Sequence, residues 1–323
     1  MTAPNLHELT PADLLEPGPG FGPARAVMST RRGGISQGPW QGLNLGSAVG
    51  DAPADVAENR RRFLDWLGRH GAWLPGSGAS DALLAGEACG GLWMRQVHGA
   101  RVLRWGRDAT GQPRALGFWA PEAAPAGHMP GLAWQVIDTP ADGTRWLPEA
   151  DACLSTEPGL PCIVQVADCL PLLLAAPDRP AVAAVHAGWR GLAGGVIEAA
   201  VAALQVASGV LPSDLQAWIG ACIGPQAFEV GAEVLPAFGA TPSQPGPGFR
   251  PSPRPAADGR PRWLGDLPAL ARLRLQALGL RQVQTAGVCT HEDAVRCFSF
   301  RRDGVTGRMA AAVWWPRQPD HPS

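Results

Sequence analysis

The apolar positions of this chain form short runs separated by glycine- and proline-rich segments, a pattern that predicts strands more often than helices. The predicted strands span residues 25–30, 92–97, 102–105, 162–166, 170–175, 181–187, 217–223, 283–289 and 308–315. The runs at 162–166, 170–175 and 181–187 are almost continuously apolar, which is typical of strands buried on both faces. The pattern therefore predicts a sheet core in the middle of the chain.

Three segments predict helices, because their apolar residues recur at intervals of three and four. They span residues 54–70, 191–208 and 267–278, and a glycine follows each of them as a stop. Asp266 is placed to cap the third helix through its carboxylate. The expected core stripe of that helix is Leu267, Leu270, Leu273 and Leu278.

Mixed strands and helices without a tandem repeat predict an α+β fold, a single domain of mixed β-sheets in layers flanked by helices. The domain is expected over residues 25–316, between a flexible lead-in at 1–24 and a tail at 317–323. Three stretches carry little periodicity and are interpreted as surface insertions: residues near 71–90, 106–135 and 239–262. Candidate site residues recur along nearly the whole chain, which favours one domain over two.

Composition narrows the classes of function. The hydrophobic fraction of 46% supports a sizeable core, and the net charge of −1 gives no argument for nucleic acid or an anionic membrane as partner. The short basic run Arg60–Arg62 is expected on the solvated face of a helix. The sequence contains no lysine, which disfavours Schiff-base enzymes and Walker-type phosphate loops.

The cysteines and the start of the chain bear on its location. The seven cysteines include no Cys-x-x-Cys pair, and the first thirty residues lack a charged start followed by an apolar stretch. We expect free thiols in a reducing compartment, and hence a cytoplasmic protein. The apolar stretch at 170–187 is interrupted by prolines and charges, so no membrane span is expected.

Three residues beside apolar runs are candidate metal ligands: His98, Cys169 and His186. Two imidazole nitrogens and one thiolate leave a fourth position open, as in catalytic zinc sites. Because wide intervals separate the three residues, spacing alone is a weak signal. Cys169 is also explained as a small buried hydrophobe, His98 as a turn residue bonded to backbone, and His186 as a core histidine with a satisfied ring.

Other residues are candidates for substrate contact. In a regular strand Asp168 would point away from the side of Cys169, so it is a better candidate for supporting the ligands or touching substrate than for direct ligation. Arg190 follows a glycine and offers a guanidinium fork for phosphate or carboxylate, although a surface salt bridge is the commoner role. Phe228 could stack on a flat base, or belong to the core. Three arginines near the C-terminus could face an anion: Arg301, Arg302 and Arg308.

Eight short motifs occur in order between about residues 25 and 315. They are Thr30–Gly34, Gly42–Gly46, Gln96–Gly99, Ala150–Ala152, Ala167–Pro171, His186–Gly191, Ile223–Pro225 with Phe228–Gly231, and Phe298–Asp303. With these motifs the chain resembles the laccase-domain family of purine nucleoside phosphorylases, also called multicopper polyphenol oxidases and peptidoglycan editing factors.

The resemblance implies a zinc site formed by His98, Cys169 and His186, with Cys169, His186 and Asp168 as catalytic residues. It implies phosphorolysis of adenosine, inosine, guanosine and methylthioadenosine, and hydrolytic deamination of adenosine. Purine nucleosides and phosphate are then the partners. The residues expected to bind substrate are Asn44, Arg190, Phe228 and Arg301. Phe228 and Phe300 stand where family members often carry tyrosine, which puts any role of a phenol hydroxyl in doubt.

Two alternatives to this hypothesis remain open. Cys169 could be the nucleophile of a hydrolase or amidase with His186 as its base, or the chain could be a non-catalytic cell-wall quality-control factor. A multicopper oxidase mechanism is excluded, because a trinuclear cluster needs His-x-His pairs and none of the seven histidines is paired in that way. Copper at a single His/Cys site stays a less favoured alternative to zinc. The sequence predicts no particular oligomeric state.

Overall fold

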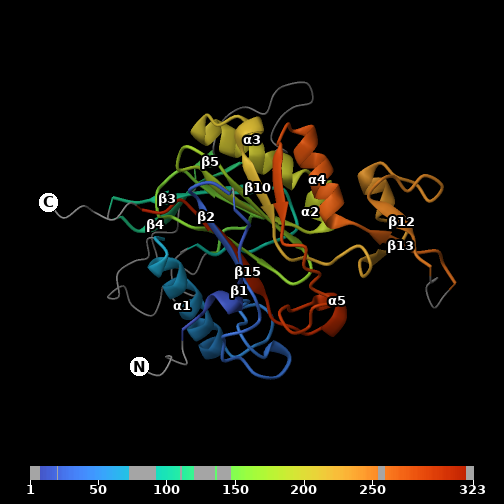
Figure 1. Ribbon diagram of the computed structural model, residues 1–323, viewed down its shortest axis with the longest axis horizontal. Coiled ribbons are helices and arrows are strands. Elements are labelled where there is room, and N and C mark those ends of the chain that lie inside the picture. The colour runs from blue at the N-terminus through green and yellow to red at the C-terminus, as the bar shows by residue number, and fades with distance from the viewer. Residues whose placement is uncertain are drawn as a thin grey trace.

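A computed structural model describes residues 8–19, 21–72, 92–109, 111–119, 135–136, 147–253 and 259–317. The strands form three sheets (Figure 1). The central sheet has eight strands in the order β14-β10-β8-β9-β6-β3-β4-β5. Their bounds are β14 Gln282–Thr285, β10 Gln216–Ile219, β8 Leu170–Ala175, β9 Val182–Ala187, β6 Ala152–Ser155, β3 Val102–Arg107, β4 Pro113–Trp119 and β5 Gln135–Val136. The β10–β14 and β3–β6 pairs are parallel and the others antiparallel, so the sheet is mixed.

Two smaller sheets complete the β-structure. The first is antiparallel, with the strands β1 Leu14–Leu15, β2 Arg25–Ser29, β15 Met309–Trp314 and β7 Cys162–Val166 in that order. It joins the beginning of the described chain to its end, because β2 and β15 are neighbours. The second is built from β11 Glu229–Val230, β13 Trp263–Gly265 and β12 Phe249–Pro251.

Helices lie on both sides of the central sheet (Figure 1). The α-helices are α1 Pro53–Arg69, α2 Trp189–Ala193, α3 Val196–Ser208, α4 Leu267–Ala277 and α5 Phe300–Asp303. Short 3-10 turns are η1 Pro11–Asp13, η2 Gly38–Trp40, η4 Pro212–Asp214 and η5 Leu235–Phe238. Figure 1 places α1 on the opposite side of the molecule from α3 and α4.

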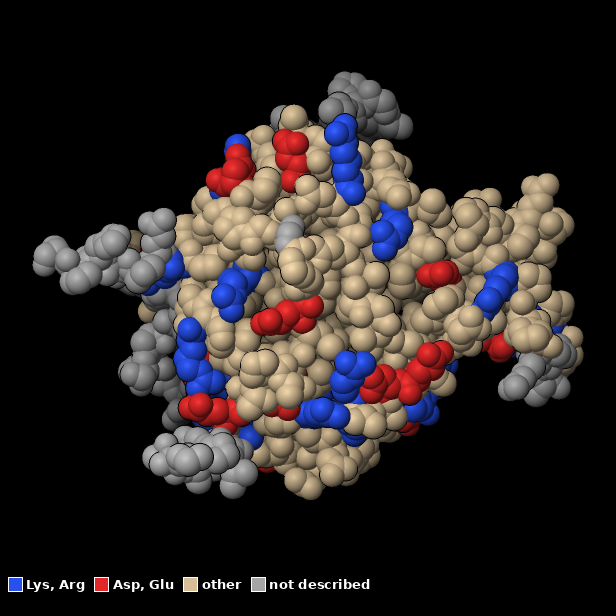
Figure 2. Space-filling view, viewed as in Figure 1, with Lys and Arg blue, Asp and Glu red and all other residues tan. Residues whose placement is uncertain are grey.

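The layers follow from the two-residue period of strand side chains. In β8, Leu172 and Leu174 share one hydrophobic core with α3 and α4, whereas Leu173 and Ala175 share the other core with α1 and the four-stranded sheet. Both faces of β8 are therefore buried, as its continuous apolar run predicts. On the face shown in Figure 2, basic and acidic side chains are intermingled, consistent with the net charge of −1.

The layered α+β fold is confirmed, and so are most predicted elements. Strands overlap the runs predicted at 25–30, 102–105, 162–166, 170–175, 181–187, 217–223, 283–289 and 308–315, although β10 and β14 end at Ile219 and Thr285, earlier than predicted. The helix predicted at 54–70 is α1, and the one predicted after Asp266 is α4. Asp266 caps α4 as predicted, because its Oδ1 accepts a hydrogen bond from the Ala269 amide at 2.9 Å.

The strand predicted at 92–97 does not form. Within this segment Arg95 makes a single β-bridge, to Glu149, and β3 pairs with β4 and β6 instead of with residues 92–97. The physical reason lies at the end of the segment. The backbone N–H groups of residues 97–99 donate to the Asp151 carboxylate and are unavailable to a ladder.

Two helix predictions need correction. The single helix expected at 191–208 is divided into α2 and α3, because Gly195 adopts a left-handed conformation with φ of 87°. In α4 the core stripe does not include Leu273, which is 43% exposed. The buried face is formed by Leu267, Leu270, Ala271 and Leu275, which follow the 3.6-residue period more closely.

Segments expected to be loose are packed where the structure describes them. In the lead-in, Leu14 and Phe21 are buried, and β1 pairs with β2, because this segment supplies apolar side chains that cover the core. In the stretch 106–135, β4 belongs to the central sheet and buries Trp119, and in the stretch 239–262 β12 pairs with β13. The expected insertion at 71–90 falls largely outside the described residues, as does most of the tail at 317–323.

The corrected face of α4 predicts a contrast between two leucines. Leu275→Ala should lower the free energy of unfolding by about 2–5 kcal/mol, because it leaves a cavity under α4. Leu273→Ala should change it by less than about 1 kcal/mol, since that side chain already contacts solvent. Denaturant unfolding of both variants measures the difference, and equal losses would contradict the assignment of the buried face.

Candidate metal centre

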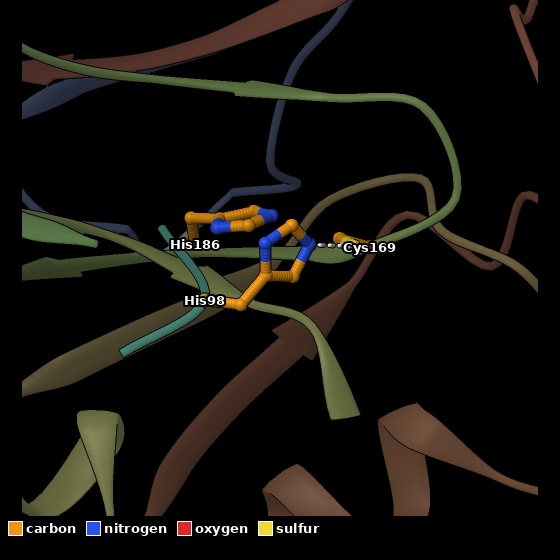
Figure 3. A group of neighbouring side chains, drawn as sticks. All are labelled: His98, Cys169 and His186. Carbon is orange, nitrogen blue, oxygen red and sulfur yellow. Dashed lines mark hydrogen bonds between the residues drawn. The ribbon is translucent and has the colours of Figure 1, made fainter. Parts of the chain in front are cut away.

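Three side chains from distant parts of the sequence converge at one end of the central sheet. The ligand atoms of His98, Cys169 and His186 all lie within 4.8 Å of one another, and His98 Nε2 is 3.8 Å from Cys169 Sγ (Figure 3). A tetrahedral zinc ion with ordinary Zn–S and Zn–N bonds places sulfur and nitrogen ligands about 3.6 Å apart. The spacing of the donors is therefore close to what such an ion requires.

The sheet explains why Cys169 and His186 meet. Cys169 directly precedes β8, and His186 lies near the end of β9, where it is paired with Pro171 in the antiparallel register. The turn from the end of β7 into β8 thus brings the thiol beside the imidazole. His98 reaches the same point from the loop before β3, with a left-handed φ of 62° that a side-chain-bearing residue seldom adopts.

A single carboxylate orients both histidines. Asp151 is fully buried and accepts a hydrogen bond from His186 Nδ1 at 2.9 Å. It also accepts from the backbone amides of His98 and Gly99, at 2.8 and 2.6 Å, and from that of Val97 at 3.1 Å. This bond to Nδ1 leaves Nε2 of His186 as the nitrogen available to a metal, an arrangement common around metal-bound histidines.

The electrostatics of the site favour a thiolate. Burial raises the pKa of Cys169, but the charge of His186 and hydrogen bonds from both histidines outweigh it and lower the pKa to about 6. Burial opposes protonation of His186, but the Cys169 thiolate and the Asp151 carboxylate raise its pKa to about 9. Between these values, in the absence of a metal, Cys169 is a thiolate and His186 an imidazolium.

Gly188 leaves room for two of the ligands. A Cβ atom at this position would lie 2.9 Å from His98 Cδ2 and 3.0 Å from Cys169 Sγ, closer than such contacts normally allow. The backbone of Gly188 itself is in an ordinary extended conformation, with φ of −63°. The requirement for glycine here comes from the space that the ligands occupy.

The carboxylate of Asp168 bonds other residues of the protein and does not face the cavity as a substrate-binding residue would. Asp168 has a left-handed φ of 97°, and its carboxylate accepts hydrogen bonds from Thr290 Oγ1 and from the Arg301 amide, both at 2.6 Å. The carboxylate thus ties the turn that carries Cys169 to the start of α5. Asp168 is not among the described residues that line the cavity at the site, and its geometry is that of a positioning residue.

The three candidate ligands line a cavity of about 510 Å³, a size suited to a small organic molecule. His98 is exposed and Cys169 is partly buried, so the site can be reached from outside. Apart from the ligands, the lining includes two aromatic side chains, two amides and three arginines, namely Trp93, Phe300, Gln96, Gln165, Arg60, Arg95 and Arg308. Sequence reasoning missed most of these residues.

The four predicted substrate residues are not brought to this cavity. Asn44 is buried and uses its side chain internally, accepting from the Arg308 amide and donating to Asp51, each at 2.8 Å. Phe228 is buried in the core on the helix side of the central sheet. Arg301 donates to the Glu229 carbonyl at 2.8 Å, and Arg190 is exposed with its guanidinium over the ring of the adjacent Trp189.

The basic run on α1 also departs from its prediction. Arg60 and Arg62 are only 2% and 6% exposed, and Arg61 alone has the partly exposed position that was expected for the whole run. Helical geometry explains the difference, since consecutive residues point about 100° apart and cannot share one face. Arg60 is the member of the run that lines the cavity.

No helix in the described ranges is long and apolar enough to cross a bilayer.

The sequence matches the model of a family described as multi-copper polyphenol oxidoreductase laccase, over residues 25–75 and 79–316. A Pseudomonas aeruginosa protein named purine nucleoside phosphorylase is 38% identical over 290 residues, covering 90% of this chain and 93% of that protein. Escherichia coli YfiH, also named purine nucleoside phosphorylase, is 35% identical over 289 residues, with the same coverage of 90% and 93%.

Solved structures show the same fold. A crystal structure of a Neisseria meningitidis protein aligns with a TM-score of 0.67 and 32% identity, covering 94% of this chain and all of that one. YlmD from Geobacillus stearothermophilus aligns with a TM-score of 0.69 and 28% identity, covering 98% of this chain and all of that one. The architecture described above is therefore shared with both proteins over nearly their whole length.

The thiolate–imidazolium pair predicts how metal binding depends on pH. Zinc should release roughly one proton near neutral pH, because His186 must lose its proton while Cys169 is already ionised. Affinity should fall below about pH 6, where the thiolate is lost as well. Calorimetry in buffers of different ionisation enthalpy counts the protons, and the ultraviolet absorbance of the metal-free protein, compared with Cys169→Ala, follows the thiolate. An affinity that does not change across this range would contradict the assignment.

The tight space at Gly188 gives a second prediction. Gly188→Ala should lower zinc affinity by about 10- to 100-fold, because the added methyl group displaces His98 or Cys169. The matched control is Gly18→Ala, where a methyl group meets only the end of the Gln284 side chain at 3.4 Å. Competition with a chromogenic chelator measures the affinity, and thermal unfolding checks the fold. Wild-type affinity in Gly188→Ala would show that these side chains do not hold the metal.

Proposed function

This chain belongs to the multi-copper polyphenol oxidoreductase laccase family, and on that premise we propose that it is a zinc-dependent purine nucleoside phosphorylase. The observation that carries the proposal is the convergence of His98, Cys169 and His186 on a cavity of small-molecule size. Relatives from Pseudomonas aeruginosa and Escherichia coli, both named purine nucleoside phosphorylase, support the choice of substrate class.

The donor set suits zinc. A thiolate and two imidazole nitrogens are ordinary zinc ligands, and three protein ligands would leave a fourth position open, as in catalytic zinc sites. When bound, zinc would supply a Lewis acid without redox chemistry. This is the one group of three neighbouring ligand side chains among the described residues, so that part of the chain offers no second set for the copper cluster implied by the family description.

The chain's own residues would hold the nucleoside. Phe300, which is 58% exposed, offers an apolar ring in the cavity for the purine, and the loop at His98 forms one wall. In phosphorolysis a phosphate oxygen bonds to ribose C1′ while the bond from C1′ to the purine nitrogen breaks. The base leaves with that electron pair and takes up a proton. Hydrolytic deamination of adenosine, which exchanges the C6 amino group for oxygen from water and releases ammonia, is the second proposed activity of the same cavity.

One observation favours a different chemistry. Asp151, His186 and Cys169 stand in the order of orienting acid, base and nucleophile found in cysteine hydrolases. A hydrolase of that kind has no need for the second imidazole, His98, at 3.8 Å from the sulfur. Metal dependence separates the two functions: a chelator should abolish phosphorolysis reversibly, whereas a free thiolate nucleophile would keep its activity without metal.

The proposed location is the cytoplasm. Six of the seven cysteines are described, and all six are free thiols. Free thiols are typical of a reducing compartment, which supports this proposal.

The proposal predicts products that require phosphate. Zinc-loaded protein should convert inosine, guanosine, adenosine and methylthioadenosine to free base and the corresponding sugar 1-phosphate only when phosphate is present, and adenosine to inosine without it. Cys169→Ala and His98→Ala should lose both activities, because each removes one metal ligand. Cys162→Ala, which removes a thiol buried in β7, is the control. Chromatography resolves the products, and no phosphate-dependent base above the level of Cys169→Ala would refute the function.

A further inference from the structure

We infer that Arg60 and Arg308 form the subsite that binds inorganic phosphate in this cavity. The inference rests on the proposed function, because phosphorolysis requires phosphate and nucleoside to meet in one space. It assigns the phosphate to two arginines that line the same cavity as the candidate metal ligands. From the sequence, Arg308 was one of three arginines that could face an anion, whereas Arg60 was expected on the solvated face of a helix.

Arg60 is a buried cation with spare hydrogen-bonding capacity. Its Nε donates to the Leu45 carbonyl at 2.9 Å, and its Nη2 lies 3.3 Å from Ser47 Oγ. Its Nη1 is buried and has no hydrogen-bond partner. The guanidinium lies 4.2 Å from the ring centre of Trp93, and both residues line the cavity.

No carboxylate in the described part of the chain forms an ion pair with Arg60, so its charge is uncompensated there. A buried charge without a counter-ion is unfavourable, and an unmade hydrogen bond adds to the cost. Burial lowers the pKa of Arg60 to about 10, so the side chain stays protonated at neutral pH. An anion in the cavity would supply both the missing charge and a hydrogen-bond acceptor.

Arg308 lies near the C-terminal end of the sequence and lines the same cavity as Arg60. Its backbone amide donates to Asn44, and its Nη1 donates to the carbonyls of Thr306 and Gly307 at 3.1 Å each. Among the described residues, its Nε and Nη2 have no partner and remain available to a ligand. The aliphatic part of the Arg308 side chain packs against Gly46, because a Cβ atom added at Gly46 would lie only 2.6 Å from Arg308 Cγ.

The two arginines therefore flank the same short loop. Arg308 covers Gly46, Arg60 reaches the neighbouring Ser47, and residues 46–49 all line the cavity. Two guanidinium groups and a serine hydroxyl suit a tetrahedral oxyanion, because each guanidinium presents donors in a planar fork.

The charge balance of the cavity supports an anion over a neutral ligand. The described residues of its lining include three arginines and no aspartate or glutamate. The third, Arg95, is already paired with Glu149 at 2.8 Å, which leaves the charges of Arg60 and Arg308 to the ligand. Arg308 lines the same cavity as Cys169, so a phosphate held by it would share that cavity with the candidate metal ligands.

The test measures phosphate binding separately from turnover. Arg60→Gln and Arg308→Gln should each raise the KM for phosphate by about tenfold or more, with a much smaller change in the KM for inosine. Calorimetric titration of zinc-loaded protein with inorganic phosphate should show the same loss of affinity. The matched control is Arg61→Gln, on the next position of α1, whose guanidinium is paired with Glu58 and Asp65 at the surface.

The outcomes distinguish failure of the phosphate subsite from failure of the proposed phosphorylase activity. Unchanged phosphate binding in both glutamine variants would overturn the subsite even if phosphorolysis is found. Phosphate binding that depends on both arginines would support it even if no nucleoside is cleaved. Tight, arginine-dependent binding of inosine monophosphate with no binding of inorganic phosphate would also overturn it, because the anion would then belong to a nucleotide. If Arg60→Gln does not fold, Arg308→Gln decides between these outcomes.

Discussion

The candidate site depends on one buried carboxylate. Asp151 directly precedes β6 and accepts hydrogen bonds from the ring of His186 and from successive amides of the loop that carries His98. Removing one partner of a buried ionic network of this kind typically costs about 3–5 kcal/mol, because the remaining charge or donors stay buried. The same side chain thus holds one imidazole by its ring and the other through its backbone, which makes the two histidines a single unit.

A second network connects this unit to the cavity wall. The Gln96 amide bonds both backbone groups of Gln165, and the Gln165 side chain donates to the Leu45 carbonyl at 2.7 Å. Leu45 also accepts from Arg60, so a continuous path of hydrogen bonds runs from the His98 loop to α1. These hydrogen bonds give a rigid frame on one side of the cavity.

The sequence revealed those parts of the molecule that leave a periodic or local signal. Continuous apolar runs identified β7, β8 and β9, and the acidic cap before Leu267 located α4. The metal ligands were identified by their motifs, because only the register of β8 and β9 and the loop before β3 bring them together. The segment before His98 was wrongly predicted to be a strand. Nothing in its own residues shows that the amides at its end bind the Asp151 carboxylate, more than fifty residues away.

Residues in the cavity wall were harder to predict for the same reason. Arg60 was read as part of a solvated basic run, although its neighbour Leu45 and the ring of Trp93 enclose it. The family resemblance made Asn44 a candidate substrate contact, whereas its side chain bonds the backbone of Gly46, the Asp51 carboxylate and the Arg308 amide. Such roles depend on partners far along the chain, which no local pattern records.

The pairing of β2 with β15 has a consequence for synthesis of the protein. The wall that contains Leu45 and Arg308 joins the first and last parts of the domain, because the Leu45 amide donates to the Arg308 carbonyl beside this strand pair. This contact cannot form before β15 has been synthesised, although His98, Cys169 and His186 stand earlier in the chain. The wall of the cavity is therefore completed later in synthesis than the candidate metal ligands.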